Sequence, residues 1–309
     1  MVTVELSGVG VVVSRVVLGL MRIQRLGDGE IRELVGAARD AGVTMFDHAD
    51  IYGDRTHGCE QRFGDAQAVP SSERHQVTIQ SKVGIRAGFF DSSREHIVSS
   101  VEQSLAALRT DYLDLLLIHR PDALVEPDEV AAAFDELHAG GKVSAFGVSN
   151  HTPAQLELLG KSVRQPLVVN QLQFSVANAA LVAQGLAANI TGLDQSADRD
   201  LGVLDYSRLK GITIQSWGSL QRPPPGGVFL GDRENYPELN DALDQLAHDH
   251  GTTATAIAVA WIARHPARMQ IVIGTTNPDR VREAAAGATV QLTREEWYRL
   301  FTAAGHTLP

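Results

Sequence analysis

Asp47, Tyr52, Lys82 and His119 stand at points of the sequence where proton-transfer chemistry is possible. Asp47, Lys82 and His119 each end or follow a short apolar run, and Tyr52 comes shortly after Asp47. Because the carboxyl ends of parallel strands meet on one rim of a barrel, we expect the four side chains to converge there. A buried lysine is costly without a partner, and Asp47 on the neighbouring strand can supply one.

These residue types fit proton transfer to a carbonyl oxygen. A free tyrosine has a pKa of about 10, too high for an acid or base near neutrality, and a nearby ammonium group lowers it. Asp47 would hold that ammonium group in place, and His119 would hydrogen-bond the substrate oxygen. No acidic or thiol group is left over as an obvious nucleophile. We therefore expect hydride from a nicotinamide cofactor.

The expected cofactor site lies after the seventh and eighth predicted strands, where barrels commonly bind phosphate. A Rossmann site is disfavoured because Gly8–Gly10 continues into three valines and lacks the dinucleotide fingerprint. Gly274–Pro278 leads into a helix N-terminus whose free N–H groups attract phosphate, and Arg280 and Arg282 lie in its first turns. Trp217 offers a flat face for a nicotinamide ring.

Strand-like apolar runs alternate with helical patterns along the chain, which predicts an α/β fold. The runs are mostly apolar on both faces, as in parallel strands that are covered on both sides. Eight are expected, at Val16–Leu18, Thr44–Phe46, Val77–Lys82, Leu113–Ile118, Val143–Val148, Leu167–Asn170, Ile212–Gln215 and Gln270–Ile273. This alternation favours a (β/α)8 TIM barrel forming one domain over residues 1–309, with an open doubly wound sheet as the alternative.

Three segments lie outside this rhythm. Val2–Leu6 and Val11–Val13 flank a glycine-containing turn and are expected to form a hairpin at the bottom of the barrel. The segments 175–209 and 221–231, after the sixth and seventh strands, are expected to be long loops that act as lids, binding loops or solvated excursions. Asn277–Pro278 is expected to cap and open a helix.

Composition excludes several other classes of protein. The 309 residues include 27 Lys and Arg against 37 Asp and Glu, a net charge of −10 with no basic run, so no nucleic-acid partner is expected. A lone cysteine, Cys59, rules out an intramolecular disulfide framework and a thiolate zinc cluster. Val9–Val13 is too short to span a membrane, and the first basic residue is Arg15, which disfavours a signal peptide. The predicted location is the cytoplasm.

The chain resembles the aldo-keto reductases over nearly its whole length. The matching segments are Gly42–Gly53 (GVTMFDHADIYG), Ser81–Lys82, Asp114–Pro121 (DLLLIHRP), Gly140–Asn150 (GGKVSAFGVSN), Asn170–Gln171, Ser216–Leu220 and Ile273–Glu283 (IGTTNPDRVRE). The DHADIYG version is similar to a bacterial branch often described only as predicted oxidoreductases. The resemblance implies NADPH-dependent reduction of an aldehyde or ketone to the alcohol. It assigns Asp47, Tyr52, Lys82 and His119 as the catalytic residues, with Tyr52 as the general acid.

The resemblance also implies a cofactor site. Ser149, Asn150 and Gln171 would hold the nicotinamide carboxamide, and Trp217 would stack on the ring where the family usually has Tyr. The other cofactor-binding residues that it implies are Gly19, Leu20, Met21, Asp47, Gly218, Leu220, Ile273, Gly274, Thr275, Arg280 and Glu283.

A few positions depart from the family pattern. Gly274 and Ala284 replace a common Lys and Asn, and Gly218–Ser219 replaces Ser-Pro. These changes weaken the expected preference for NADPH over NADH. Arg280 supports the preference, because guanidinium groups bind phosphate well. NADP(H) is therefore the expected cofactor, with NAD(H) as the alternative.

Arg22 and Arg120 follow rim strands and, with Tyr52 and His119, are the residues expected to contact a small carbonyl substrate. A nucleotide-sensing regulatory subunit that keeps the fold but has little turnover is the alternative function. No oligomeric state is predicted.

A third hypothesis is a metal-dependent barrel hydrolase. Its ligands would be Asp47, His48, Asp50 and His119. Lys82 disfavours it, because the ammonium group would repel a cation. No metal site is therefore expected.

Overall fold

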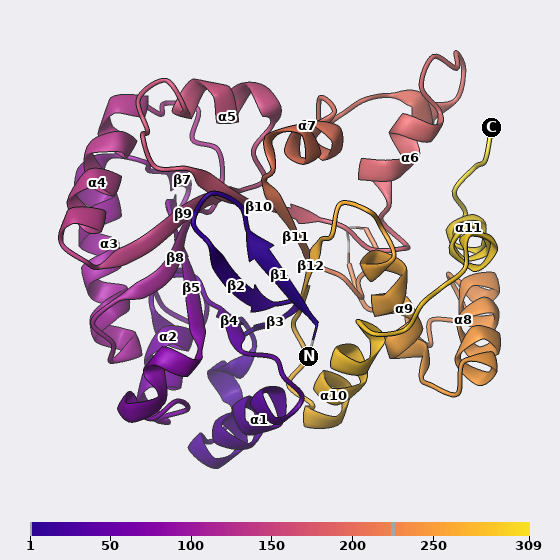
Figure 1. Ribbon diagram of the computed structural model, residues 1–309, viewed down its shortest axis with the longest axis horizontal. Helices are drawn as coiled ribbons and strands as arrows, with labels where there is room; N and C mark the ends of the chain where they lie inside the picture. The colour runs from indigo at the N-terminus through magenta and orange to yellow at the C-terminus, as the bar shows by residue number, and fades with distance from the viewer. Residues whose placement is uncertain (1, 224–225) are drawn as a thin grey trace.

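A closed barrel of eight parallel strands lies at the centre of the molecule (Figure 1). The computed structural model describes residues 2–223 and 226–309. The barrel strands are β3 (Val16–Gly19), β4 (Met45–Asp47), β5 (Thr78–Val83), β8 (Leu113–Ile118), β9 (Val143–Ser149), β10 (Leu167–Gln173), β11 (Thr213–Trp217) and β12 (Gln270–Ile273). All eight predicted strands are present, and their ends differ from the predicted ones by a few residues. Because the sheet closes on itself, the alternative of an open doubly wound sheet is wrong.

Helices surround the barrel on the outside (Figure 1). They are α1 (Asp28–Asp40), α2 (Gly58–Asp65), α3 (Arg94–Leu108), α4 (Pro127–Ala139), α5 (Pro153–Leu159), α6 (Ala180–Leu186), α7 (Val203–Lys210), α8 (Pro237–Asp249), α9 (Ala254–Ala263), α10 (Pro278–Gly287) and α11 (Arg294–Ala303). Asn277 caps α10 as predicted, since its side chain accepts hydrogen bonds from the N–H groups of Asp279 and Arg280. The single domain over 1–309 stays a prediction.

An antiparallel hairpin, β1 (Thr3–Leu6) and β2 (Val11–Ser14), lies against the barrel as predicted (Figure 1). Leu6 and Val13 are buried in one cluster with barrel residues such as Val17, Met45 and Leu115. The hairpin therefore closes the lower interior with apolar side chains, as the sequence predicts.

The long segments after β10 and β11 differ in structure. Residues 175–209 are not one continuous loop, because they contain α6, a short 3-10 helix (Asp194–Ser196) and most of α7. In the segment 221–231, an antiparallel bridge joins Gln221 to Val228, and the described residues form no helix. Residues 224 and 225 of that segment lie outside the described residues.

Membrane insertion receives no support from the helices. In the part of the chain that the structure describes, every helix is too short or too polar to cross a membrane. The cytoplasmic location stays a prediction.

Candidate active site

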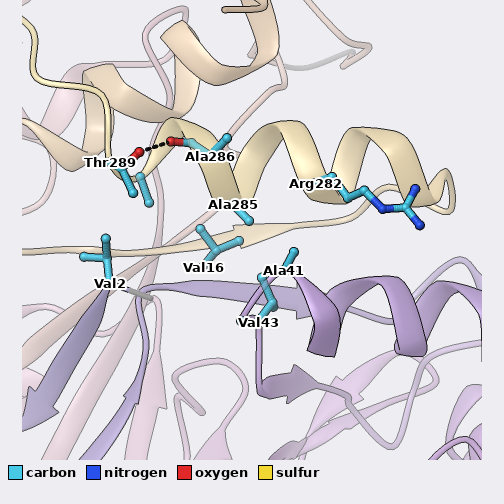
Figure 2. A pocket seen from close by; sticks show the side chains of 10 residues that line it. Val2, Val16, Ala41, Val43, Arg282, Ala285, Ala286 and Thr289 are labelled. Carbon is cyan, nitrogen blue, oxygen red and sulfur yellow. Dashed lines mark hydrogen bonds between the residues drawn. The ribbon is translucent and has the colours of Figure 1, made fainter.

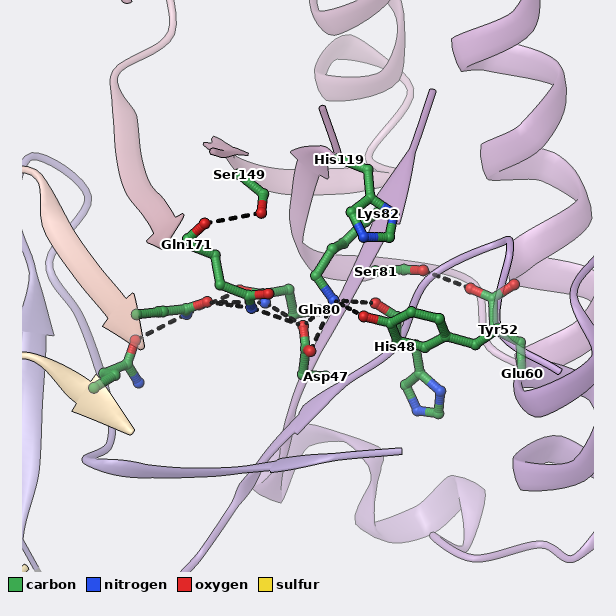
Figure 3. Close-up of polar contacts among 12 residues, drawn as sticks. Asp47, His48, Tyr52, Glu60, Gln80, Ser81, Lys82, His119, Ser149 and Gln171 are labelled. Carbon is green, nitrogen blue, oxygen red and sulfur yellow. Dashed lines mark hydrogen bonds and ion pairs between the residues drawn. The ribbon is translucent and has the colours of Figure 1, made fainter. Parts of the chain in front are cut away.

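A buried ion pair anchors the candidate site at the carboxyl rim of the barrel (Figure 3). Lys82 on β5 is almost wholly buried, and its Nζ lies 2.7 Å from the carboxylate of Asp47 at the end of β4. Nζ also donates to the backbone oxygen of His48 at 2.8 Å and to the hydroxyl of Tyr52 at 3.1 Å. The pairing that the sequence predicts between Asp47 and Lys82 is present, and it places the ammonium group directly on the tyrosine.

The turn after β4 gives Tyr52 its position. The backbone N–H of Tyr52 donates to the backbone oxygen of Ala49 at 3.1 Å. The backbone oxygen of Tyr52 accepts from the N–H of Cys59 at 2.9 Å. Gly53 has a φ of 109° in this turn, and a Cβ there would lie 2.5 Å from Oε1 of Gln24. Only glycine is therefore compatible with the turn. The hydrogen bond from Cys59 ties the turn to α2.

Burial decides the protonation of Tyr52 and Lys82. Burial raises the pKa of Tyr52, and the Lys82 ammonium offsets only part of that rise. The expected net lowering of the Tyr52 pKa is therefore wrong for this structure. Burial alone would lower the pKa of Lys82, but Asp47 and Tyr52 together hold it above its usual value. Tyr52 thus keeps its proton at neutral pH, as a proton donor must.

His119 follows β8 and faces Tyr52 edge-on, with the ring centroids 5.8 Å apart. Burial, together with the charges of Lys82 and Arg120, lowers the pKa of His119 to about 2. The imidazole is therefore neutral at physiological pH. Its Nδ1 has no hydrogen-bond partner among the residues that the structure describes. A neutral ring beside Tyr52 can hydrogen-bond a substrate oxygen without adding charge.

A cavity of about 570 Å³ opens beside these residues and runs from Tyr52 toward the start of α10. The predicted cofactor residues that line it are Gly19, Met21, Asp47, Ser149, Asn150, Gln171, Trp217, Gly218, Leu220, Ile273, Gly274, Thr275 and Arg280. The predicted substrate residues Arg22, Tyr52, His119 and Arg120 line it too.

Two predicted cofactor residues do not line the cavity. Leu20 is fully buried in the hydrophobic core between the barrel and its helices, so its side chain is not available to a ligand. Glu283 lies nearly one turn further along α10 than Arg280, which is the last cavity residue on that helix. The resemblance placed both in the cofactor site. Packing in the core withdraws the Leu20 side chain, and the role of Glu283 stays a prediction.

The nicotinamide end of the cavity has polar atoms that fit a carboxamide. Asn150 donates to Oγ of Ser149 at 2.8 Å and accepts from Nε1 of Trp217 at 3.0 Å. Oε1 of Gln171 faces the cavity without a hydrogen-bond partner in the described part of the chain, whereas its Nε2 is engaged. Gly218, with a φ of 65°, turns the chain directly after Trp217. A dinucleotide therefore fits this end of the cavity.

The phosphate end differs from the expectation. The first N–H groups of α10 are not all free, because Asn277 already accepts from two of them. Arg282 points its guanidinium to Asp279, 2.6 Å away. The guanidinium of Arg280 makes no hydrogen bond or ion pair within the described ranges, and it lines the cavity. Arg280 is thus the residue best placed to bind a phosphate.

Sequence reasoning missed several glutamines that lie inside the barrel below Asp47. Gln80, Gln215 and Gln270 are buried and hydrogen-bonded to one another or to Asp47. The signal was available, because each is a long polar residue in a predicted strand, next to a buried isoleucine (Ile79, Ile214 or Ile271). Other cavity-lining residues that were missed are Ser219, Gln221, Val228, Leu230, Thr255, Val272 and Thr276.

The structure does not assemble the metal site of the third hypothesis. The His48 ring packs edge-on against Phe63, with centroids 4.8 Å apart, and Asp50 accepts from Oγ of Ser100 at 2.9 Å. Over residues 2–223 and 226–309, no group of three or more His, Cys, Asp or Glu side chains is arranged to hold a metal ion.

A second, smaller cavity of about 290 Å³ lies at the other end of the barrel, between α1 and α10 (Figure 2). Its walls include Val2, Val16 and Val43, and its one charged wall residue is Arg282, which is paired with Asp279. None of the predicted site residues line it. The cavity beside Tyr52 is therefore the candidate active site.

Such a barrel, with an Asp–Lys–Tyr set and a histidine beside a dinucleotide-sized cavity, defines an oxidoreductase of the TIM-barrel class. The sequence model of the Aldo/keto reductase family matches residues 15–303, and the chain belongs to this family. It is an NAD(P)H-dependent reductase.

Relatives and solved structures agree with this assignment. The chain is 35% identical to the oxidoreductase YdhF of Escherichia coli (strain K12), over 96% of this chain and 95% of that protein. It is also 35% identical to a 6-dehydroglucose reductase of Agrobacterium fabrum, over 94% of each. The fold is similar to that of MGS-M4, an aldo-keto reductase from a deep-sea metagenome library, with a TM-score of 0.72 and 21% identity over 98% and 94% of the two chains.

Proposed function

We propose that the protein reduces a small aldehyde or ketone to the alcohol with NADPH, and that Tyr52 is the general acid. The observation that carries this proposal is the position of Lys82, whose Nζ bonds both the Asp47 carboxylate and the Tyr52 hydroxyl. Few structural roles need a fully buried ammonium group against a tyrosine hydroxyl at a cavity wall, whereas proton transfer does.

The reduction divides between the cofactor and this chain's residues. When bound, NADPH supplies hydride to the carbonyl carbon. The Tyr52 hydroxyl donates its proton to the carbonyl oxygen, and the Lys82 ammonium stabilises the tyrosinate that is left. His119 orients the carbonyl by a hydrogen bond. The alcohol then leaves, and solvent returns a proton to Tyr52.

Different cavity residues would contact different parts of the cofactor. Trp217 would lie on the nicotinamide ring, with Ser149, Asn150 and Gln171 at its carboxamide. Gly218 and Leu220 would lie beside the pyrophosphate, and Thr275 beside the adenosine phosphate. Arg280 would bind the 2′-phosphate, which supports NADPH over NADH.

Arg120 is the substrate contact that the geometry favours. Arg22 already donates to the Gly274 oxygen at 2.7 Å, so it belongs to the cofactor side of the cavity. Arg120 instead lies with its guanidinium carbon 5.9 Å from the centre of the Trp217 ring, with no ion pair in the described chain. A polar carbonyl compound, such as the sugar aldehyde implied by the name of the Agrobacterium relative, fits such a rim.

Replacing Tyr52 with phenylalanine tests the proposal. The variant Tyr52→Phe removes the donated proton and should lower kcat by at least about 100-fold. NADPH binding, measured by fluorescence titration, should stay within about twofold of wild type, because the hydroxyl accepts from Lys82 and Tyr52 is not among the residues proposed to hold the cofactor. Full carbonyl turnover in this variant would refute the proposed role of Tyr52.

A further inference from the structure

Four glutamines from four strands form a hydrogen-bonded chain through the barrel interior. Gln80, Gln171, Gln215 and Gln270 come from β5, β10, β11 and β12, and each is at most 3% exposed. Hydrophobic side chains such as Met45, Leu117 and Val272 form a buried cluster with other strand residues of the barrel, so amides are not required to fill the volume. A buried amide without partners costs about 1–3 kcal/mol. The hydrogen bonds among the four amides therefore do more than allow their burial, because they also fix the orientation of each amide.

The lower end of the chain fixes the orientation of every amide above it. The Ser14 backbone oxygen can only accept, so Nε2 of Gln270 must face it, at 2.8 Å. Oε1 of Gln270 then accepts from Nε2 of Gln215 at 2.9 Å. Oε1 of Gln215 therefore points the other way, and accepts from Nε2 of Gln80 and of Gln171, each at 3.0 Å.

The upper end of the chain imposes the same direction. Oδ1 of Asp47 accepts from Nε2 of Gln80 at 2.5 Å and from Nε2 of Gln171 at 3.2 Å. A carboxylate cannot donate, so both amides must present their nitrogen to it. Turning one amide over would set N–H against N–H or oxygen against oxygen. Gln171 is left with Oε1 toward the cavity.

We propose that Gln80, Gln215 and Gln270 are positioning residues that fix the Gln171 amide and the Asp47 carboxylate. The backbone oxygen of Ser14, at the bottom of the barrel, thereby sets the direction of every hydrogen bond among the glutamines. As a result, Gln171 presents an acceptor rather than a donor to the cofactor site. Gln171 presents only this acceptor, so the site favours a nicotinamide whose 3-substituent carries N–H donors. The same chain holds Asp47 against Lys82 from the side opposite Tyr52. This inference rests on the proposed function.

Binding of two dinucleotides tests the selection without any turnover. NADPH carries the carboxamide N–H donors, and its 3-acetylpyridine analogue carries a methyl ketone in their place. Wild type should bind NADPH about tenfold more tightly than the analogue, the size expected for one good hydrogen bond. In Gln215→Met, which removes the central amide with little change of volume, the preference should fall to about threefold or less.

The pH dependence of turnover separates positioning from mere stability. Gln215→Met should lower kcat by about tenfold at all pH values, since a misplaced Asp47–Lys82 pair misplaces Tyr52. Gln215→Glu should recover part of the way toward wild type as pH falls, because a protonated carboxyl restores the acceptor and one of the two hydrogen bonds that the amide donates. A purely structural role would leave the kcat of folded protein and its pH profile unchanged.

Two further variants complete the design. The control is Gln184→Met, which removes a glutamine on α6 that bonds Asp200, far from the four glutamines of the barrel. It should keep the wild-type dinucleotide preference and the wild-type kcat. Gln270→Met acts at the Ser14 end and replaces Gln215→Met if that variant does not fold.

The outcomes are distinct. Unchanged dinucleotide preference and kcat in folded Gln215→Met or Gln270→Met would overturn the inference. If the wild-type protein binds NADPH but reduces no carbonyl compound, the proposed function is contradicted. A loss of the dinucleotide preference in Gln215→Met or Gln270→Met would still support the role of the glutamine chain.

Discussion

Burial gives the ionisable residues of the site different protonation states within a few ångströms. Tyr52 keeps its proton and Lys82 keeps its charge, whereas His119 remains neutral. An acid with its proton in place, beside a fixed ammonium group and an uncharged hydrogen-bonding ring, is the arrangement that carbonyl reduction needs. Cys59 takes no part, since burial raises its pKa to about 11.

Arg280 should decide the cofactor preference at the residue scale. Its guanidinium has no protein partner in the described chain, so a phosphate would be its counter-ion. Arg280→Ala should raise the KM for NADPH by about 10- to 100-fold and change the KM for NADH by less than about twofold. The control is Arg282→Ala, because Arg282 is paired with Asp279. Equal KM increases for both cofactors would contradict the assignment.

The turn between β4 and α2 is the element that positions Tyr52 beside the carboxyl ends of the barrel strands. Buried Glu60 on α2 accepts from Oγ of Ser81 at 2.5 Å and from Oγ of Ser104 at 3.1 Å, and pairs with His57 at 2.6 Å. These bonds tie α2 to β5, next to Lys82, and to α3. The Tyr52 turn is therefore held between two strands and two helices, which limits its movement.

Gly53→Ala tests whether this turn sets the position of Tyr52. A side chain at φ 109° is strained and meets Gln24, so we expect a loss of about 2–4 kcal/mol in the free energy of unfolding. We also expect kcat to fall at least about tenfold in the folded protein. The matched control is Gly36→Ala within α1, where a Cβ meets open space and should stabilise by about 0.5–1 kcal/mol. Urea unfolding and steady-state kinetics measure both effects, and wild-type kcat in folded Gly53→Ala would contradict this role.

Buried and half-buried histidines link the stability of the whole molecule to pH. Burial lowers the pKa of His48, His151 and His265 to about 4 and that of His119 to about 2. The unfolded chain binds these protons below about pH 6.5, and the folded chain does not until about pH 4. Stability is therefore lost as pH falls through this window. Asp50 acts in the opposite direction, because burial raises its pKa to about 6, but the histidines outnumber it.

His48→Leu should reduce this acid sensitivity. Neither ring nitrogen of His48 has a hydrogen-bond partner within residues 2–223 and 226–309, so leucine removes no bond. Wild type should lose about 2 kcal/mol more unfolding free energy than His48→Leu between pH 7 and pH 5. Urea unfolding at the two pH values measures the difference, with exposed His248→Gln as the control. An identical pH slope in wild type and His48→Leu would show that His48 does not titrate on unfolding.

Much of the fold was predictable from the sequence because its signals are local. Apolar runs marked all eight barrel strands, Asn277 marked the start of α10, and the valines on both sides of Gly8–Gly10 marked the hairpin. The segment 175–209 was read less well, because its short helices α6 and α7 lie in a polar stretch whose pattern resembles a loop.

The residue types at the strand ends by themselves determined the barrel rim and its Asp47–Lys82 pair, because strand direction brings those ends together. Only the tertiary structure decided that the Tyr52 pKa rises, since burial is a property of the packed chain. It also decided that Leu20 faces the core, that Asn277 occupies the α10 amides, and that the amide of Gln171 turns its oxygen to the cavity. That last orientation depends on Ser14 and on glutamines from distant strands, and no local pattern in the sequence contains it.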